Sequence, residues 1–145
     1  MKEKHLMNIV SESGERNFEI KDKVIIIEKI LKKGENIEVH WHDYFELEII
    51  LSGEAEHIYN NEKQLITRGN AFLMSYCDFH AFKCLTDVKI INIRFFNNFL
   101  DKELNDYISF GAGRFNTSFD EDEIGLILKI CEKVFLEEKK KRKYI

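Results

Sequence analysis

The feature that most constrains this chain is a short strand-like segment with polar, metal-competent side chains on one face. His42 follows His40 by two positions, and Glu46 follows His42 by four. Strand side chains alternate between two faces with a period of two, so a regular strand directs all three groups to the same side. Burying such groups without partners is unfavourable. That face must therefore line a cavity in place of an ordinary hydrophobic core.

Two glycines bracket this segment at defined distances. Five residues separate Gly34 from His40, and six separate Glu46 from Gly53. With His42 in its place, the spacing resembles the first motif of the cupin superfamily at every defined position. Cupins are small β-barrels, so the resemblance implies a barrel whose interior contains the polar face.

A second segment, which begins at Gly69, resembles the second cupin motif in part. Gly69 and His80 stand at the glycine and histidine positions of that motif. Its usual proline, glycine and asparagine are replaced by Ser75, Cys77 and Cys84. The residues that shape the loop are therefore changed, whereas the histidine remains. Chance is a poor explanation for the spacing, because two separated motifs agree.

In cupins, the two histidines and the glutamate of the first motif bind a metal together with the histidine of the second. The resemblance therefore implies a metal site formed by His40, His42, Glu46 and His80. Three imidazoles and one carboxylate suit Zn, Ni, Fe or Mn and leave coordination positions open. The same side chains could instead form a hydrogen-bonded lining for an organic effector without a metal. Both interpretations stay open at this point.

Side chains of the same parity would join this cavity if the strands are regular. They form a predicted ligand pocket of Tyr44, Glu48, Phe82 and Cys84. A second buried carboxylate, at Glu48, requires a cationic or hydroxyl-bearing ligand, a metal-bound water or a partner side chain. A bulge at residues 43–44 would instead turn Glu48 outward. His57 belongs to neither motif.

A longer stretch points to one branch of the superfamily. Residues 40–82 open with His-x-His-Asp and two aromatic residues, continue through a glycine-punctuated hairpin, and pass a Gly-x-x-Phe-Leu-x-Ser turn before a histidine. These features resemble the effector-binding, arabinose-binding-like domain of AraC-type bacterial transcription regulators over residues 24–96. Such regulators join a sensory barrel to a helical dimerisation segment and a helix-turn-helix DNA-binding domain. Their sensory domains commonly work without a metal.

Short segments rich in β-branched residues, bounded by turn residues, predict strands along the first part of the chain. They lie at 24–31, 37–42, 45–51, 56–59, 63–66, 71–75, 80–85 and 88–96. The Asn60–Asn61 pair favours a hairpin turn, because asparagine tolerates positive φ. Together with the resemblance, the pattern predicts an all-β cupin-type barrel (a double-stranded β-helix, or jelly roll) as a sensory domain at residues 1–96.

A helical pattern replaces the strands at residues 97–145. We expect one helix at Asn98–Phe110 and a longer amphipathic helix that begins with a capping box at Ser118–Glu121. The apolar stripe of the second helix consists of Ile124, Ile127, Leu128, Cys131, Val134 and Phe135. Either the outer face of the barrel or the same helix of a second chain must cover this stripe. The AraC-type resemblance favours the second, and so implies a homodimer and a linker towards a DNA-binding domain absent from this chain.

Bulk composition fits one small domain and argues against direct nucleic-acid binding. The chain has 145 residues and a net charge of −4, with a pI near 5.8. The basic run Lys139–Lys143 is typical of a solvated helix face or a linker. Three cysteines without C-x-x-C spacing, Cys77, Cys84 and Cys131, favour a reducing cytoplasmic location. No apolar run reaches the ~20 residues of a membrane span.

Two functions from different classes follow from these patterns. The leading one is the ligand-sensing and dimerisation domain of an AraC-type regulator, which binds a small molecule, with or without a divalent metal. It would reach DNA only through a domain outside this chain. The alternative is a free-standing metal-dependent cupin enzyme of the dioxygenase or isomerase type. The fold alone does not decide, but the relaxed second motif and the amphipathic helix favour the sensor, for which we expect no catalytic residues.

Overall fold

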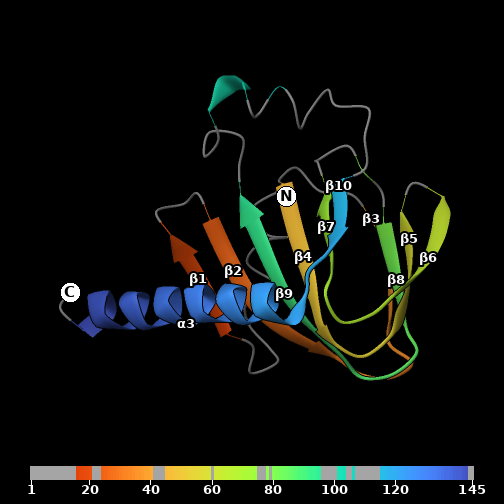
Figure 1. Cartoon of the computed structure of the whole chain (residues 1–145), viewed down its shortest axis with the longest axis horizontal. Helices are drawn as coiled ribbons and strands as arrows, with labels where there is room; N and C mark the ends of the chain where they lie inside the picture. Colours follow the sequence, from red (N-terminus) through yellow and green to blue (C-terminus); the bar gives the residue numbers. More distant parts are fainter. Residues whose placement is uncertain are drawn as a thin grey trace.

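The structure is a computed structural model that describes residues 16–20, 24–40, 45–59, 61–74, 78, 80–95, 101–103, 106 and 115–143. Ten strands form two antiparallel sheets within this part of the chain (Figure 1). The six-stranded sheet has the order β1 (Arg16–Ile20), β2 (Val24–Leu31), β9 (Val88–Phe95), β4 (Phe45–Ser52), β7 (Asn70–Met74) and β10 (Phe115–Ser118). The four-stranded sheet has the order β3 (Asn36–His40), β8 (His80–Cys84), β5 (Ala55–Tyr59) and β6 (Glu62–Ile66). The expected all-β jelly roll is thus confirmed.

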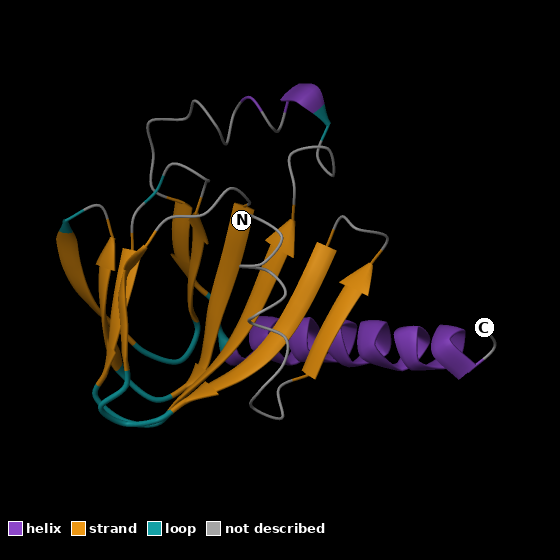
Figure 2. Cartoon of the chain, turned by 180° about the vertical axis from the view of Figure 1, so that it is seen from behind, coloured by secondary structure: helices purple, strands orange, loops and turns teal. Residues whose placement is uncertain are grey.

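Alternation along the strands divides the apolar side chains between two cores. One core lies between the sheets and contains Leu31, Ile50, Ala55, Ile66, Phe72, Met74, Phe82, Cys84, Val88 and Ile90. The other lies on the outer face of the six-stranded sheet, beneath helix α3 (Glu121–Lys143). Figure 2 shows this helix lying across the sheet on the side away from the smaller sheet. Both faces of β4 are therefore covered, which explains why its pattern includes buried residues of both parities.

Helix α3 packs its expected stripe against the barrel of its own chain. Ile124, Cys131 and Phe135 are buried in the outer core, and Ile127 and Val134 pack half-buried against it. Leu128, the sixth residue of the stripe, is 37% exposed. The structure contains a single chain, so pairing with a second copy stays a prediction. None of the helices in the described ranges is both long and apolar enough to cross a membrane.

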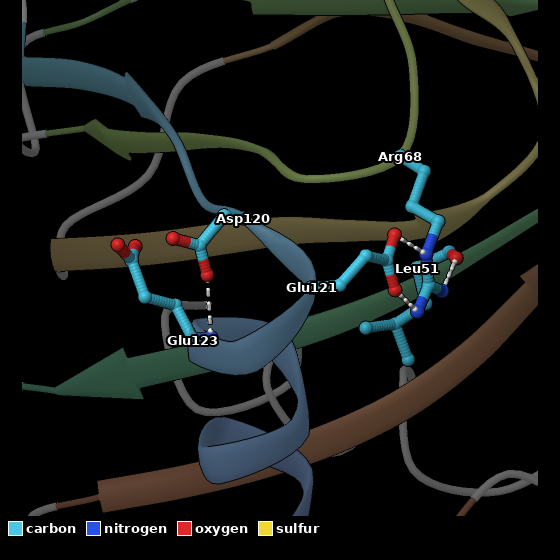
Figure 3. A network of polar contacts seen from close by, with 5 residues as sticks. All are labelled: Leu51, Arg68, Asp120, Glu121 and Glu123. Carbon is cyan, nitrogen blue, oxygen red and sulfur yellow. Dashed lines mark hydrogen bonds and ion pairs between the residues drawn. The ribbon is translucent and has the colours of Figure 1, made fainter.

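The beginning of α3 differs from the expected capping box. Ser118 is the last residue of β10, where it stands opposite Asn70 of β7, so its backbone is extended. The helix begins after Asp120, whose Oδ1 accepts a hydrogen bond of 2.9 Å from the backbone N–H of Glu123 (Figure 3). The prediction of Ser118 as the cap was wrong, because strand pairing holds the chain extended up to that residue. Asp120 provides the cap instead.

An arginine clamp fastens this helix end to the barrel. Arg68, in the turn between β6 and β7, donates from Nε and Nη2 to the two carboxylate oxygens of Glu121, each at 2.8 Å. Its Nη1 donates to the backbone carbonyl of Leu51 (Figure 3). The neighbouring Gly69 has φ +92°, and a Cβ there would lie 2.5 Å from the carbonyl oxygen of Phe119. Glycine at this motif position therefore permits a close approach of two backbones.

Two further expectations concern the turn between β5 and β6 and the segment after residue 96. The hairpin turn between β5 and β6 has Asn61 at φ 69°, as expected from its sequence. The expected helix at residues 98–110 lies mostly outside the described residues. The segment 97–145, expected to be helical, also contributes the strand β10, which extends the six-stranded sheet.

Candidate functional site

Two glutamates of β4 point into the space between the sheets. Both are buried although glutamate is an ionisable residue: Glu46 is 2% exposed and Glu48 is 4% exposed. They stand two residues apart on one strand face, opposite Arg94 and Asn92 of the neighbouring β9. No bulge lies between them, because the β4–β9 register is continuous from Phe45 to Ile50. Within the described part of β4, the regular-strand alternative therefore applies to Glu48.

Asn92 joins the two carboxyl groups into one network. Its amide Nδ2 donates to Oε1 of Glu46 and, at 3.0 Å, to Oε1 of Glu48. The other end of the amide, Oδ1, accepts a hydrogen bond of 2.9 Å from Nε of Arg94. The amide thus accepts from Arg94 and donates to both carboxyl groups, which links the four side chains in one network. Buried polar groups of this kind are stable only when such partners are present.

Burial changes the ionisation of the pair. Removal from water raises the pKa of Glu48 well above its ordinary value, and the neighbouring charge of Glu46 raises that pKa further. Arg94 and Lys29 act in the opposite direction. The arrangement therefore favours a neutral Glu48 in the ligand-free protein. Within the part of the chain that the structure describes, Oε2 of Glu48 has no hydrogen-bond partner.

Two buried histidines of the opposite sheet complete the site, and one of them, His80, meets the carboxyl group of Glu46. His80, at the start of β8, places Nε2 3.9 Å from Oε2 of Glu46. Its other ring nitrogen, Nδ1, lies 3.4 Å from Nε2 of His57 on β5. Both imidazoles are 1% exposed. The site is therefore a contact between the two sheets, closed from solvent.

The donor atoms of this site fit a divalent metal. Glu46, Glu48 and His80 each offer a ligand atom, and these atoms lie within 4.8 Å of one another. Two carboxylates and an imidazole suit transition metals such as Zn, Fe, Ni or Mn. The same atoms are also suitable acceptors for hydroxyl or ammonium donors of an organic ligand.

The structure brings together part of the predicted metal set. Glu46 and His80 meet as expected, and the backbone of His40 pairs with that of His80 across β3 and β8. The side chain of His40, like His42 and Tyr44 as a whole, lies outside the described residues.

The remaining predicted pocket residues belong to the core between the sheets. Phe82 and Cys84 are 3% and 2% exposed and share their face of β8 with His80. Burial raises the pKa of the Cys84 thiol, which makes it a poor thiolate ligand. Phe82 stacks on His57, with ring centroids 4.6 Å apart. Cys84 therefore fills space, whereas Phe82 contacts the site itself.

Three site residues escape the sequence motifs. Asn92 and Arg94 of β9 carry a usable signal, since they alternate with Ile91 and Ile93 on a strand whose one other charged residue is Lys89. Two polar residues of equal parity on such a strand indicate a second polar patch inside the barrel. His57 carries no such signal, because a single histidine on a short hairpin strand is equally compatible with the surface.

A small pocket lies beside the site. It has a volume of about 170 Å³ and is lined by Tyr59, Glu62, Lys63, Gln64, Phe72, Leu73 and Asn116. These residues come from β5, β6, β7 and β10, so the pocket opens where the edges of the two sheets face each other. The Phe72 ring also contacts His57, with ring centroids 4.5 Å apart. The Tyr59 ring, whose centroid lies 6.1 Å from that of His57, lines the pocket as well, so aromatic rings lie between the pocket and this buried histidine.

Two facing antiparallel sheets with converging glutamate and histidine side chains define a cupin-type jelly roll, and solved structures agree. A cupin superfamily protein from Desulfitobacterium hafniense is 19% identical with a TM-score of 0.53, covering 59% of this chain and 79% of that one. The Cnp3 cupin domain of Schizosaccharomyces pombe is 14% identical with a TM-score of 0.54, covering 70% and 72%. At these identities the likeness concerns the fold alone.

The family is narrower than the fold. Residues 32–128 match the AraC-like ligand binding domain, and the chain belongs to that family. A related sequence is the HTH-type transcriptional activator RhaR of Pectobacterium atrosepticum, which is 34% identical over 60 residues. RhaR of Pectobacterium carotovorum matches over the same length with the same identity. The match covers 41% of this chain and 21% of the relative, so it spans about a fifth of the whole activator.

Proposed function

We propose that this chain is the effector-sensing domain of an AraC-type transcriptional regulator, with the effector bound between the sheets beside Glu46, Glu48 and His80. One observation carries the proposal: a polar, ionisable cluster occupies the interior of the barrel. An apolar core would often be at least as stable there, so the cluster is best explained by a ligand that uses it. The match to ligand-binding domains and the similarity to RhaR support a sensor over a free-standing dioxygenase or isomerase.

A divalent metal is the first candidate for the group held by this cluster. The three described donors lie close enough to share one ion, and the sequence motif adds His40 and His42 to the proposed ligands. A bound metal would supply open coordination positions for oxygen atoms of the effector. In the second form of the proposal, the effector itself hydrogen-bonds to these side chains without a metal. Either form predicts that the site residues, not the apolar core, determine ligand affinity.

Elemental analysis separates the two forms. For protein purified without an affinity tag or added metal, we expect a stoichiometric divalent metal. His80→Ala and Glu46→Gln should each lower it sharply. Lys83→Ala is the matched control, because Lys83 is exposed on the same strand as His80. Metal near zero in the unmodified protein would restrict the proposal to the metal-free form.

A thermal-shift screen of polyols, sugars and amines then tests the metal-free form. A ligand that occupies the site should raise the melting temperature of the wild type, and should do so much less for Glu48→Leu. A chain that takes up neither metal nor any of these compounds would contradict the proposed site.

The dimer is proposed to use the exposed side of α3. Leu126 and Ile130 are 60% and 55% exposed, one helical turn apart, and Leu136 is 51% exposed. Because the buried stripe is occupied by the barrel, a partner helix would contact these residues and the half-buried Ile127. Ile130→Asp should then yield a folded monomer, measured by light scattering with the circular dichroism of the β-sheets retained. A wild-type chain that stays monomeric at high concentration would contradict this interface.

DNA binding is proposed to come only from a helix-turn-helix domain outside this chain, in a cytoplasmic regulator. The net charge of −4 supports this division of labour. The isolated chain should therefore not shift duplex DNA in a gel at low salt.

A further inference from the structure

A pair of buried histidines lies at the centre of the site, and the motifs account for only one of them. His57 and His80 come from the paired strands β5 and β8, where His80 stands opposite Tyr59 and His57 opposite Phe82. The two histidines are thus diagonal neighbours on one face. Nε2 of His57 lies 3.4 Å from Nδ1 of His80, and both rings are 1% exposed.

The contact uses a particular nitrogen of His80. A neutral imidazole has one N–H donor and one acceptor nitrogen. In this structure Nδ1 of His80 faces His57, whereas Nε2 faces Oε2 of Glu46 at 3.9 Å. For Nε2 to bind a metal or accept a proton from an effector, it must carry the lone pair. The proton must then reside on Nδ1, which can donate it only to an acceptor such as Nε2 of His57.

Neighbouring aromatic rings hold the imidazole of His57 in place. Its ring stacks on Phe82 at 4.6 Å with an interplanar angle of 18° and meets Phe72 at 4.5 Å and 59°. The His80 ring approaches its edge at 5.5 Å and 83°. If the ring at position 57 only filled space, a phenylalanine would serve equally well. The nitrogen atoms are therefore the feature that needs an explanation.

We infer that His57 is a positioning residue, which accepts a hydrogen bond from Nδ1–H of His80 and so keeps the lone pair of His80 on Nε2, the nitrogen that faces Glu46 and the ligand. The inference rests on the proposed function in one respect, namely that His80 contacts the ligand. Partners of this kind commonly fix the tautomer and orientation of metal-binding histidines. Here the partner is a second histidine on the adjacent strand of the same sheet.

Nitrogen NMR of the metal-free protein tests the inference directly. Long-range ¹H–¹⁵N spectra of the imidazoles distinguish the two neutral tautomers. We expect His80 to carry its proton on Nδ1 in the wild type, and to lose this preference in His57→Phe, which keeps an aromatic ring between Phe72 and Phe82. His80 protonated on Nε2 in the wild type would overturn the inference, whether or not the protein binds a metal.

Cobalt(II) binding gives a second, independent measure. Titrated into metal-free protein and followed by visible absorption, Co²⁺ should bind ~10–100-fold more weakly to His57→Phe than to the wild type. His57→Gln, whose amide oxygen is again an acceptor, should recover part of the affinity. Equal affinity of wild type and His57→Phe would show that His57 only fills space.

If His57→Phe does not fold, a second pair of variants tests the same inference. His57→Gln and His57→Leu have similar volumes and differ mainly in the acceptor. Tighter Co²⁺ binding by the glutamine variant supports the inference, and equal binding overturns it. A wild type that takes up no Co²⁺ contradicts the metal form of the proposed function alone, because the NMR result stands without it.

Discussion

Removing the amide of Asn92 should destabilise the protein more than any exposed substitution in the same sheets. Asn92→Leu keeps the approximate volume but deletes three hydrogen bonds: two donated to Glu46 and Glu48, and one accepted from Arg94. A hydrogen bond to a charged group contributes about 1.5–3 kcal/mol, and a neutral one about 0.5–1.5 kcal/mol. Because Glu48 favours its neutral form, we count its bond as neutral. The three bonds also belong to one network, whose energies are not additive.

The expected loss is therefore about 3–5 kcal/mol, a large part of the ~5–15 kcal/mol that stabilises a typical domain. Urea unfolding followed by circular dichroism, with chelator present, measures it. Asn36→Leu is the matched control, since Asn36 is exposed on β3 and its replacement should change stability by less than ~0.5 kcal/mol. A loss below ~1 kcal/mol for Asn92→Leu would refute the view that this amide stabilises the carboxyl pair.

Two further predictions concern the helix. Phe135 is 3% exposed beneath α3, so Phe135→Ala should lower the free energy of unfolding in urea by ~3–5 kcal/mol. Ile130 is 55% exposed, so Ile130→Ala should lower it by less than ~1 kcal/mol. Equal losses would contradict the observed orientation of the helix. The hydrogen bonds from Arg68 lower the pKa of Glu121 below its ordinary 4.5. A carboxyl group with a lowered folded-state pKa stabilises above its unfolded pKa and loses that contribution as pH falls through the folded value. The small stability difference between wild type and Glu121→Gln should therefore be present at pH 7 and vanish in acid, and a difference that persists at pH 2 would count against the ion pair.

The first half of the site could be predicted because its information is local. The spacing of His40, His42 and Glu46 singled out Glu46, although the prediction that one strand carries all three was wrong. His40 ends β3 of the four-stranded sheet, whereas Glu46 lies on β4 of the six-stranded sheet, and His42 lies outside the described residues. The second motif then supplied His80. Glu48 followed from its parity with Glu46, and its burial beside Asn92 shows that it does not turn outward. Residues 43–44, the place of the alternative bulge, lie outside the described residues.

The other half depends on pairing between strands, which a single sequence does not contain. Asn92 belongs to the site because it stands opposite Glu48, and Arg94 because it stands opposite Glu46. His57 is included only because β5 pairs with β8 in one register. The observed helix cap differs from the predicted one for the same reason. The β10–β7 pairing extends to Ser118, so the helix begins later than its sequence suggests.

Strand β4 contributes residues both to the site and to the core beneath helix α3. Its inward face carries Glu46 and Glu48, whereas its outward face carries Phe45 and Ile49, which belong to the core that α3 covers. A ligand that draws Glu46 towards His80 acts on a strand whose outward residues belong to the same core as Ile124 and Phe135 of α3. Close-packed interiors transmit such displacements because they contain little free volume. A ligand can bias the position of α3 only to the extent that it binds one arrangement of β4 more tightly than another. The buried carboxyl pair is the part of β4 where that difference in affinity would arise.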